Sequence, residues 1–155
     1  MAVNLLEEEI SGEEKTEELG QKIAGLLQAG DVLALYGELG AGKTCLVRGL
    51  ARGLSLDERL VASPSFSLIN EYPGPLPLVH IDCYRLILEE ELEELGLEEY
   101  LGGPCITVIE WAERIKDLPE ERLEIVFTIR DENRRHISIR AFGNWDKRIK
   151  KRFKG

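Results

Sequence analysis

The fold class expected for this chain follows from one segment, Gly37-Glu38-Leu39-Gly40-Ala41-Gly42-Lys43-Thr44. It comes directly after the near-continuous apolar run 31–36, which is typical of a strand buried on both faces of a parallel sheet. Residues 43–53 then predict a helix. The segment matches the pattern G-x-x-x-x-G-K-[ST] in the strand–loop–helix setting that this pattern requires. We therefore expect an α/β fold of the P-loop NTPase type with a mostly parallel central sheet.

The same segment predicts a phosphate-binding site. Its glycines allow the backbone N–H groups and the helix N-terminus to point at phosphate oxygens. Lys43 would supply charge to the β- and γ-phosphates, and Thr44 would offer its hydroxyl to a magnesium ion. The plainer alternative is an ordinary glycine-rich turn. The agreement of strand, loop, Lys-Thr pair and helix favours a nucleotide site instead.

Two carboxylates end two further predicted strands. The runs 78–83 and 106–110 are apolar in their middle and carry Asp82 and Glu110 at their carboxyl ends, with His80 on the same face as Asp82 by period-2 alternation. Ligands bind at this edge of an open sheet, where a P-loop also needs a carboxylate for its metal. We expect one carboxylate to serve magnesium and the other to orient the attacking water. The alternatives are a helix cap for Asp82 and a surface charge for Glu110, but buried unpaired carboxylates are costly.

The nucleotide favoured by the sequence is ATP. A GTPase switch domain would carry an N-K-x-D motif, and the chain contains no Asn-Lys pair. A small-molecule kinase stays open as an alternative, although the chain is short for one and has no arginine-rich lid segment between its central strands. A binding module in which hydrolysis is incidental is the other alternative. We favour a protein that hydrolyses ATP and couples the hydrolysis to another process.

The remaining pattern predicts one domain over residues 1–155 with a mixed sheet. Further strands are expected at 3–10 and 66–72, and a hairpin at 123–130 and 136–142, turning at 131–133, should extend the sheet. A helix is expected at 13–28, because Ser11 and Glu14 have capping-box spacing. The acidic stretch 89–101 predicts a solvated helix.

Charge and cysteine content limit the binding partners and the cellular compartment that we expect. The chain has 29 acidic and 20 basic residues, a net charge of −9, yet residues 147–155 form a basic tail. That tail could be a solvated helix end or a contact for nucleic-acid phosphates or an acidic partner. Cys45, Cys83 and Cys105 lack the spacing of a disulfide framework or a zinc site. With no apolar run of spanning length and no export-signal pattern, we expect a soluble cytoplasmic protein without a membrane role.

Short segments outside the P-loop carry a more specific signal. They are Thr16-Glu17-Glu18-Leu19-Gly20, Ser63-Pro64-Ser65-Phe66, His80-Ile81-Asp82-Cys83-Tyr84-Arg85-Leu86, Glu91-Leu92, Leu95-Gly96 and Ile109-Glu110-Trp111. With the P-loop, they make nearly the whole chain similar to the TsaE family, also called YjeE, small P-loop ATPases of bacterial tRNA threonylcarbamoyladenosine synthesis. The family usually has Ser-Pro-Thr where this chain has Ser-Pro-Ser, and the basic tail is less typical of it.

The resemblance implies a set of site residues. ATP would contact Gly37, Glu38, Leu39, Gly40, Ala41, Gly42, Lys43, Thr44, Cys45, Trp111 and Arg134. Thr44, Asp82 and Glu110 would lie at Mg²⁺, with Lys43, Asp82 and Glu110 as the catalytic residues, and the loop at Ser63 would act as a switch. From the residues alone, Trp111 is equally a core anchor, Ser63 a cap and Arg134 a solvated charge.

The resemblance also implies partners. The family works with TsaB and TsaD, and TsaD transfers the threonylcarbamoyl group to the tRNA. This chain would then be the ATPase partner, touching tRNA indirectly through the complex. The sequence offers no obvious second cation for the transition state, so we expect slow hydrolysis alone and activation by the partners.

Overall fold

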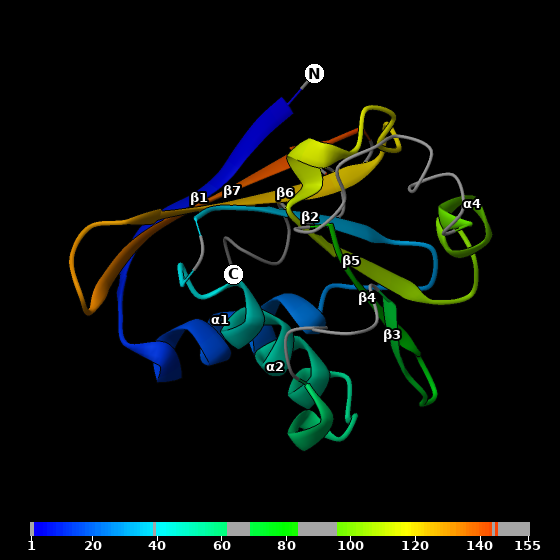
Figure 1. The fold of residues 1–155 in the computed structure, drawn as a ribbon, viewed down its shortest axis with the longest axis horizontal. Coiled ribbons are helices and arrows are strands. Elements are labelled where there is room, and N and C mark those ends of the chain that lie inside the picture. Colours follow the sequence, from blue (N-terminus) through cyan, green and yellow to red (C-terminus); the bar gives the residue numbers. More distant parts are fainter. Residues whose placement is uncertain (1, 39, 62–68, 84–95, 144, 146–155) are drawn as a thin grey trace.

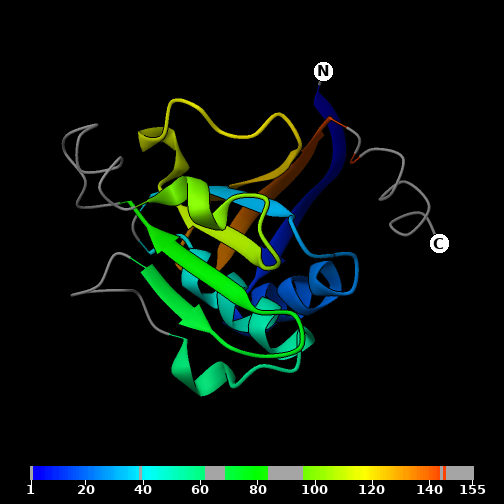
Figure 2. The ribbon, with the colours of Figure 1, turned by 90° about the vertical axis from the view of Figure 1, so that its right-hand side faces the viewer.

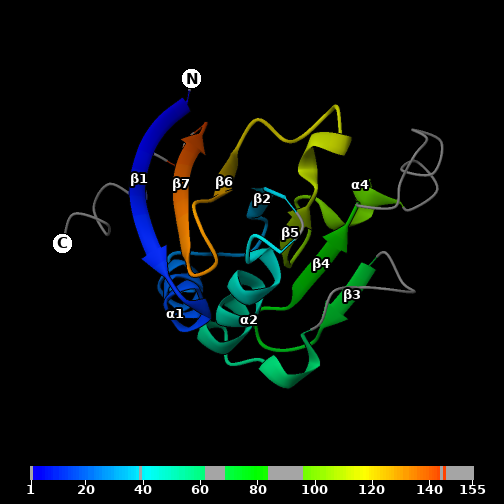
Figure 3. The ribbon, with the colours of Figure 1, turned by 60° about the vertical axis from the view of Figure 1, so that its left-hand side comes forward.

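The structure is a computed structural model that describes residues 2–38, 40–61, 69–83, 96–143 and 145. Its centre is a seven-stranded sheet in the order β1-β7-β6-β2-β5-β4-β3, which Figure 3 shows from one edge strand to the other. The strands are β1 (Ala2–Ser11), β2 (Val32–Tyr36), β3 (Ile69–Tyr72), β4 (Leu78–Asp82), β5 (Ile106–Glu110), β6 (Arg122–Ile129) and β7 (Arg134–Phe142).

The four middle strands of the sheet are parallel and its flanks are antiparallel. β2 pairs in parallel with both β5 and β6, and β4 pairs in parallel with β5. The hairpin β6–β7 then extends the sheet on one side, as the sequence predicts. The sequence pattern did not indicate that β1 joins β7, or β3 joins β4, as antiparallel edge strands. The expected mixed α/β sheet is confirmed, with more antiparallel pairing at its edges than expected.

Helices cover both faces of the sheet. On one face lie α1 (Glu13–Ala24) and α2 (Lys43–Gly53), visible together under the strands in Figures 1 and 2. Their apolar side chains pack on strand residues such as Leu33, Leu35 and Val108. Residues of α4 (Leu97–Tyr100) and of the 3-10 turn η2 (Ala112–Arg114) pack on the opposite face. Because both faces are covered, β2, β4 and β5 are buried along almost all of their length and are largely apolar, which explains why they could be predicted from the sequence.

The helices α1 and α2 approach each other closely through glycines. A Cβ built on Gly49 would lie 2.1 Å from the carbonyl oxygen of Glu17, and one on Gly20 would lie 2.4 Å from the carbonyl oxygen of Leu46. No side chain fits at either position without movement of the backbone. This contact fixes α2, and with it the loop that precedes α2, against the rest of the molecule.

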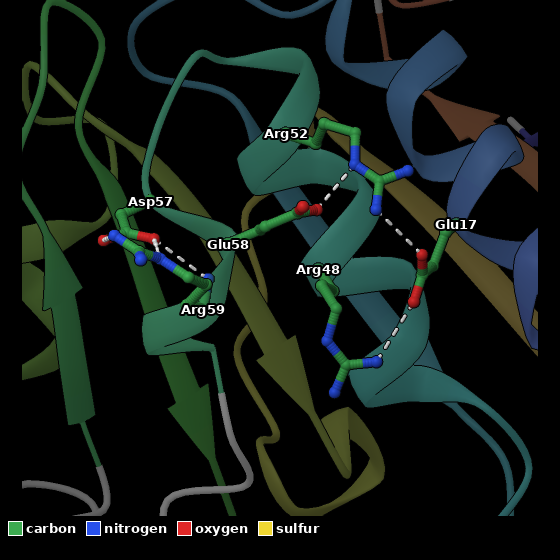
Figure 4. A network of polar contacts seen from close by, with 6 residues as sticks. All are labelled: Glu17, Arg48, Arg52, Asp57, Glu58 and Arg59. Carbon is green, nitrogen blue, oxygen red and sulfur yellow. Dashed lines mark hydrogen bonds and ion pairs between the residues drawn. The ribbon is translucent and has the colours of Figure 1, made fainter.

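Ion pairs reinforce the same helix contact. Glu17 of α1 accepts hydrogen bonds from Arg48 and Arg52 of α2, each at 3.1 Å (Figure 4). Arg52 also pairs with Glu58 in η1 (Glu58–Leu60), and Asp57 caps η1 by accepting a hydrogen bond from the backbone N–H of Arg59. Glu17 thereby links α1 to two successive turns of α2.

The start and end of α1 differ from the sequence expectation. Ser11 belongs to β1, where it pairs with Arg134, so the predicted capping box is wrong; Gly12 precedes the helix instead, without a side-chain cap. The helix ends at Ala24 rather than Gln28. The apolar spacing continues past Ala24, but the backbone turns there, and Asp31 accepts the N–H of Gln28 through its side chain. Periodicity alone could not detect this turn.

Other expectations differ in extent or fall outside the described residues. The first strand and the hairpin are each shifted or lengthened by one or two residues, and the run 31–36 forms a strand from Val32. The strand expected at 66–72 is described only as β3, and the helix at 89–101 only as α4. The loop at Ser63, the basic tail 147–155 and Leu39 lie outside the described residues. None of the helices in the described part is long and apolar enough to cross a membrane.

Candidate functional site

The glycine-rich segment forms the connection between β2 and α2. Gly40 (φ 81°) and Gly42 (φ 106°) adopt left-handed backbone conformations, which glycine accepts without strain. A Cβ on Gly40 would meet nothing within 4 Å, so the backbone faces open space there. Gly42 immediately precedes α2, whose first residue is Lys43. The segment thus has the strand–loop–helix geometry that the sequence predicts.

Lys43 lies almost entirely buried within this loop, with 4% of its surface exposed. Its ammonium group donates a hydrogen bond to the carbonyl oxygen of Gly37 and lies 3.6 Å from the centroid of the Trp111 ring. Burial lowers the pKa of Lys43, and Glu110, Glu113 and Asp82 oppose that shift by favouring the charged form. The positive charge of Lys43 is therefore favoured by the charges of three carboxylates.

Asp82 and Glu110 are the last residues of two adjacent parallel strands. They are in-register neighbours between β4 and β5, and only 8% and 3% of their surfaces are exposed. Their charges both act on Lys43 at the start of α2. The structure thus brings together the two carboxylates and the lysine that the sequence analysis selected. Their chemical roles stay predictions at this point.

Two residues near this site were not assigned a role from the sequence. The imidazole of His80 is fully buried, and its Nε2 contacts Oε2 of Glu110. From the sequence, period-2 alternation predicted only that His80 lies on the same face of its strand as Asp82. Glu113 acts on the charge of Lys43 from η2. The sequence pattern did not select Glu113. Its position depends on the left-handed backbone of Trp111, which directs the chain into η2 and which no local pattern indicates.

Trp111 has a left-handed backbone conformation, with φ 59° and ψ 44°, which is uncommon for a residue with a bulky side chain. It lies between the end of β5 and η2, and its partly buried ring contacts Lys43. Strained backbone that the surroundings hold in place is typical of functional sites. Trp111 also packs against the apolar core on its face of the sheet, so it makes both a core contact and a contact with the loop lysine, and its part in nucleotide binding stays a prediction.

Three further predicted site residues are Thr44, Cys45 and Arg134. Thr44 and Cys45 follow Lys43 in the first turn of α2 and are both partly exposed; burial raises the pKa of the Cys45 thiol. Arg134 is exposed and donates to Asp131 at 2.7 Å in its own hairpin turn. Its neighbour Arg135 instead reaches the loop and donates to the carbonyl of Gly40 at 3.3 Å. Nucleotide contact by Arg134 stays a prediction.

The residues present fit a nucleotide with a shared magnesium ion. No group of three or more His, Cys, Asp or Glu side chains in the described residues could hold a metal alone. Magnesium, however, is usually held by one or two carboxylates together with substrate phosphates, and keeps its remaining waters. The oxygen donors Thr44, Asp82 and Glu110 match that preference, and Lys43 with the open backbone at Gly40 matches an anion.

These features define the class as an α/β protein with a seven-stranded mixed sheet and a glycine-rich loop at the carboxyl end of its central strands. A family model described as "Threonylcarbamoyl adenosine biosynthesis protein TsaE" matches residues 10–137. The chain belongs to the TsaE family.

Individual relatives agree with the family match. The chain is 45% identical over 133 residues to the tRNA threonylcarbamoyladenosine biosynthesis protein TsaE of Bacillus subtilis, covering 84% of this chain and 82% of that one. The protein of the same name from a Nostoc species is 45% identical over 138 residues, covering 86% and 84%. The fold is similar to the crystal structure of Bacillus subtilis YdiB, with a TM-score of 0.84 and 36% identity over 99% of this chain and 96% of that one.

Proposed function

We propose that this protein is an ATP-binding and ATP-hydrolysing subunit that supports the synthesis of threonylcarbamoyladenosine in tRNA, together with TsaB and TsaD. Family membership and the names of the relatives support the pathway. The P-loop sequence and its position support ATP as the ligand. The transfer to tRNA belongs to TsaD in this proposal, and this chain supplies the nucleotide cycle.

One observation carries the proposal. A buried lysine at a helix N-terminus and two buried carboxylates at adjacent strand ends interact at the same edge of the sheet. Burying these groups without a role would cost stability, since each loses its hydration. Buried charged groups gathered at the carboxyl edge of a parallel sheet are typical of a ligand-binding site.

Each residue has a distinct proposed role. The backbone of residues 37–44 would bind the phosphates, and Lys43 would leave the carbonyl of Gly37 to neutralise them. Thr44 and Glu110 would hold magnesium, with Asp82 binding it directly or through water or orienting the attacking water. When bound, the ion supplies positive charge to the phosphate oxygens and lowers the barrier to displacement. Trp111 would cover one side of the lysine and limit water access.

Hydrolysis by the chain alone should be slow. In P-loop enzymes, an arginine that neutralises the transition state is worth roughly a thousandfold or more in rate. In the described residues, Arg48 is paired with Glu17 and Arg134 with Asp131, while the exposed Arg135 donates to the carbonyl of Gly40 in the loop. We propose that TsaB and TsaD supply a cation or order the site, which includes placing Arg135.

The test is single-turnover hydrolysis of labelled ATP by the chain alone and with TsaB and TsaD. We expect the partners to raise the rate, and we expect Glu110→Gln and Asp82→Asn to lower it by about ten- to a thousandfold while ATP binding persists. Glu124→Gln is the matched control, because Glu124 is also buried but holds Arg122 and Arg140 in β6 and β7.

Three results would count against this mechanism. Unaltered turnover in both carboxylate variants would remove Asp82 and Glu110 from it. A rate of several per second for the chain alone, unchanged by the partners, would show that partner activation is wrong. Label transferred to an acceptor instead of released as phosphate would indicate a kinase.

A further inference from the structure

We propose that His80 is a positioning residue that fixes the carboxylate of Glu110 at the nucleotide site. The inference rests on the proposed function of Glu110 in ATP hydrolysis and extends it to a side chain that does not touch the nucleotide. It is carried by the register of β4 and β5, by the burial of the imidazole, and by the contact that its Nε2 atom makes with Glu110.

The strand register brings the two side chains to one face of the sheet. His80 is paired with Val108, and Asp82 is paired with Glu110, so His80 is the diagonal neighbour of Glu110. Diagonal neighbours on one sheet face lie within reach of long or aromatic side chains. The Nε2 atom of His80 accordingly contacts Oε2 of Glu110. Because a carboxylate oxygen only accepts, Nε2 donates the hydrogen.

The surroundings of His80 make this contact its main polar interaction. The ring has no exposed surface, and Nδ1 has no hydrogen-bond partner among the residues that the structure describes. The ring of Tyr72 lies 6.5 Å away between centroids in a tilted arrangement. The His80 ring is thus enclosed within the protein, and the polar contact that it makes in the described part of the chain is with Glu110.

A structural role alone does not favour histidine at this position. Burying an imidazole with one nitrogen unpaired costs free energy, and an apolar side chain such as phenylalanine or leucine would fill the same space without that cost. What an apolar side chain lacks is a donor for the carboxylate. We conclude that the donor is the reason for histidine at this position.

The donor has a specific consequence for the site. One oxygen of Glu110 is engaged by His80, which fixes the plane of the carboxylate and leaves the other oxygen available to the nucleotide side. Without that donor, the carboxylate could rotate toward Lys43, the nearby cation on which its charge already acts. Partners that orient a metal-binding or catalytic carboxylate typically contribute about ten- to a hundredfold to affinity or activity.

The test compares two substitutions of His80 with a control at the second histidine of the chain. His80→Phe fills the space without a donor, His80→Gln retains an N–H donor, and His136→Gln changes a histidine of β7 that pairs with Glu9. We expect His80→Phe to lower the single-turnover rate of ATP hydrolysis by about ten- to a hundredfold. The dissociation constant for ATP should change less than about twofold. His80→Gln should recover part of the rate, and His136→Gln should match the parent chain.

A second readout uses the nucleotide-free chain and does not depend on activity. The sequence has only two histidines, so their ring nitrogens can be followed by ¹⁵N NMR. Glu110→Gln replaces a charged acceptor with a neutral one, which weakens the hydrogen bond. We expect the Nε2–H signal of His80 to shift in Glu110→Gln while the signals of His136 stay in place.

The outcomes separate this inference from the proposed function. If Glu110→Gln slows hydrolysis but His80→Phe does not, the positioning role is wrong and the proposed function stands. If the parent chain neither binds nor hydrolyses ATP, the proposed function fails irrespective of the NMR result. If His80→Phe does not fold, the decision falls to His80→Gln and the NMR signal; an unshifted His80 signal in Glu110→Gln would overturn the inference.

Discussion

At the residue scale, the ionisation of a side chain depends on the groups that lie next to it in the fold, and Tyr36 is an example. Tyr36 at the end of β2 donates a hydrogen bond to Glu124 of β6 at 3.2 Å. Burial, followed by the charge of Glu124, raises the pKa of Tyr36 to about 12 from its ordinary value of 10.0. Both effects favour the neutral phenol, because a phenolate would be poorly hydrated and would repel the carboxylate.

This pKa gives a prediction for stability at alkaline pH. A group with a raised pKa in the folded state stabilises the fold fully below its unfolded pKa, and the contribution is lost as pH rises through the folded value. We expect the free energy of unfolding in urea to fall from pH 10 towards pH 12, and to fall less steeply in Tyr36→Phe. Parallel pH profiles for the two chains would contradict the assignment.

Residue identity in the site was partly predictable from the sequence. Asp82 and Glu110 could be selected because each ends an apolar strand, and strand ends of a parallel sheet meet at one edge. The role of His80 could not be read, because its contact depends on the register between β4 and β5. The hydrogen bond from Arg135 to Gly40 could not be predicted either, because it depends on how the hairpin lies against the loop.

At the element scale, the close contact between α1 and α2 places the loop that precedes Lys43. A Cβ at Gly49 would lie 2.1 Å from the carbonyl oxygen of Glu17, so an alanine there must separate the helices. Overpacking of this kind costs about 1–3 kcal/mol, often more against backbone, and alanine recovers about 1 kcal/mol of it through helix propensity. The ion pairs of Glu17 with Arg48 and Arg52 would be strained by the same shift.

We therefore expect Gly49→Ala to lower the free energy of unfolding by about 2 kcal/mol and to weaken ATP binding, because the loop moves with α2. Gly25→Ala is the matched control. Gly25 has helical backbone angles, and a Cβ there would make an ordinary contact at 3.5 Å with the carbonyl oxygen of Lys22. Urea unfolding and an ATP titration of both variants would check this. Equal stability of the two variants would show that the helices can separate freely.

Element boundaries show where sequence patterns stop being informative. The helix α2 was predicted with its observed limits, because a glycine loop precedes it and the apolar spacing ends with it. The helix α1 was predicted too long and with the wrong cap. Its start is set by the pairing of Ser11 with Arg134 in β7, a partner more than a hundred residues away in sequence. Non-local pairing of this kind leaves no local signal.

At the scale of the whole molecule, the middle of the sheet was predictable and its edges were not. The strands β2, β4 and β5 are largely apolar because helices cover both faces, whereas β1 carries the exposed acidic residues Glu7, Glu8 and Glu9 of an edge strand. The candidate site lies in the middle of the sheet, which is the part that the sequence predicted. The glycine loop, Lys43 and the two carboxylates all lie at the carboxyl end of the parallel strands, which is the edge that binds ligands in open α/β sheets.

The central claim is that this edge binds the phosphates of ATP, and calorimetric titration of ATP with magnesium into Lys43→Ala tests it most directly. Lys15→Ala is the control, because Lys15 is exposed and pairs only with Glu18 in the part of the chain that the structure describes. We predict that Lys43→Ala abolishes tight binding, since the phosphates lose the cation that the loop supplies, while Lys15→Ala binds like the parent chain. Unchanged affinity in Lys43→Ala, in a chain that remains folded, would contradict the account.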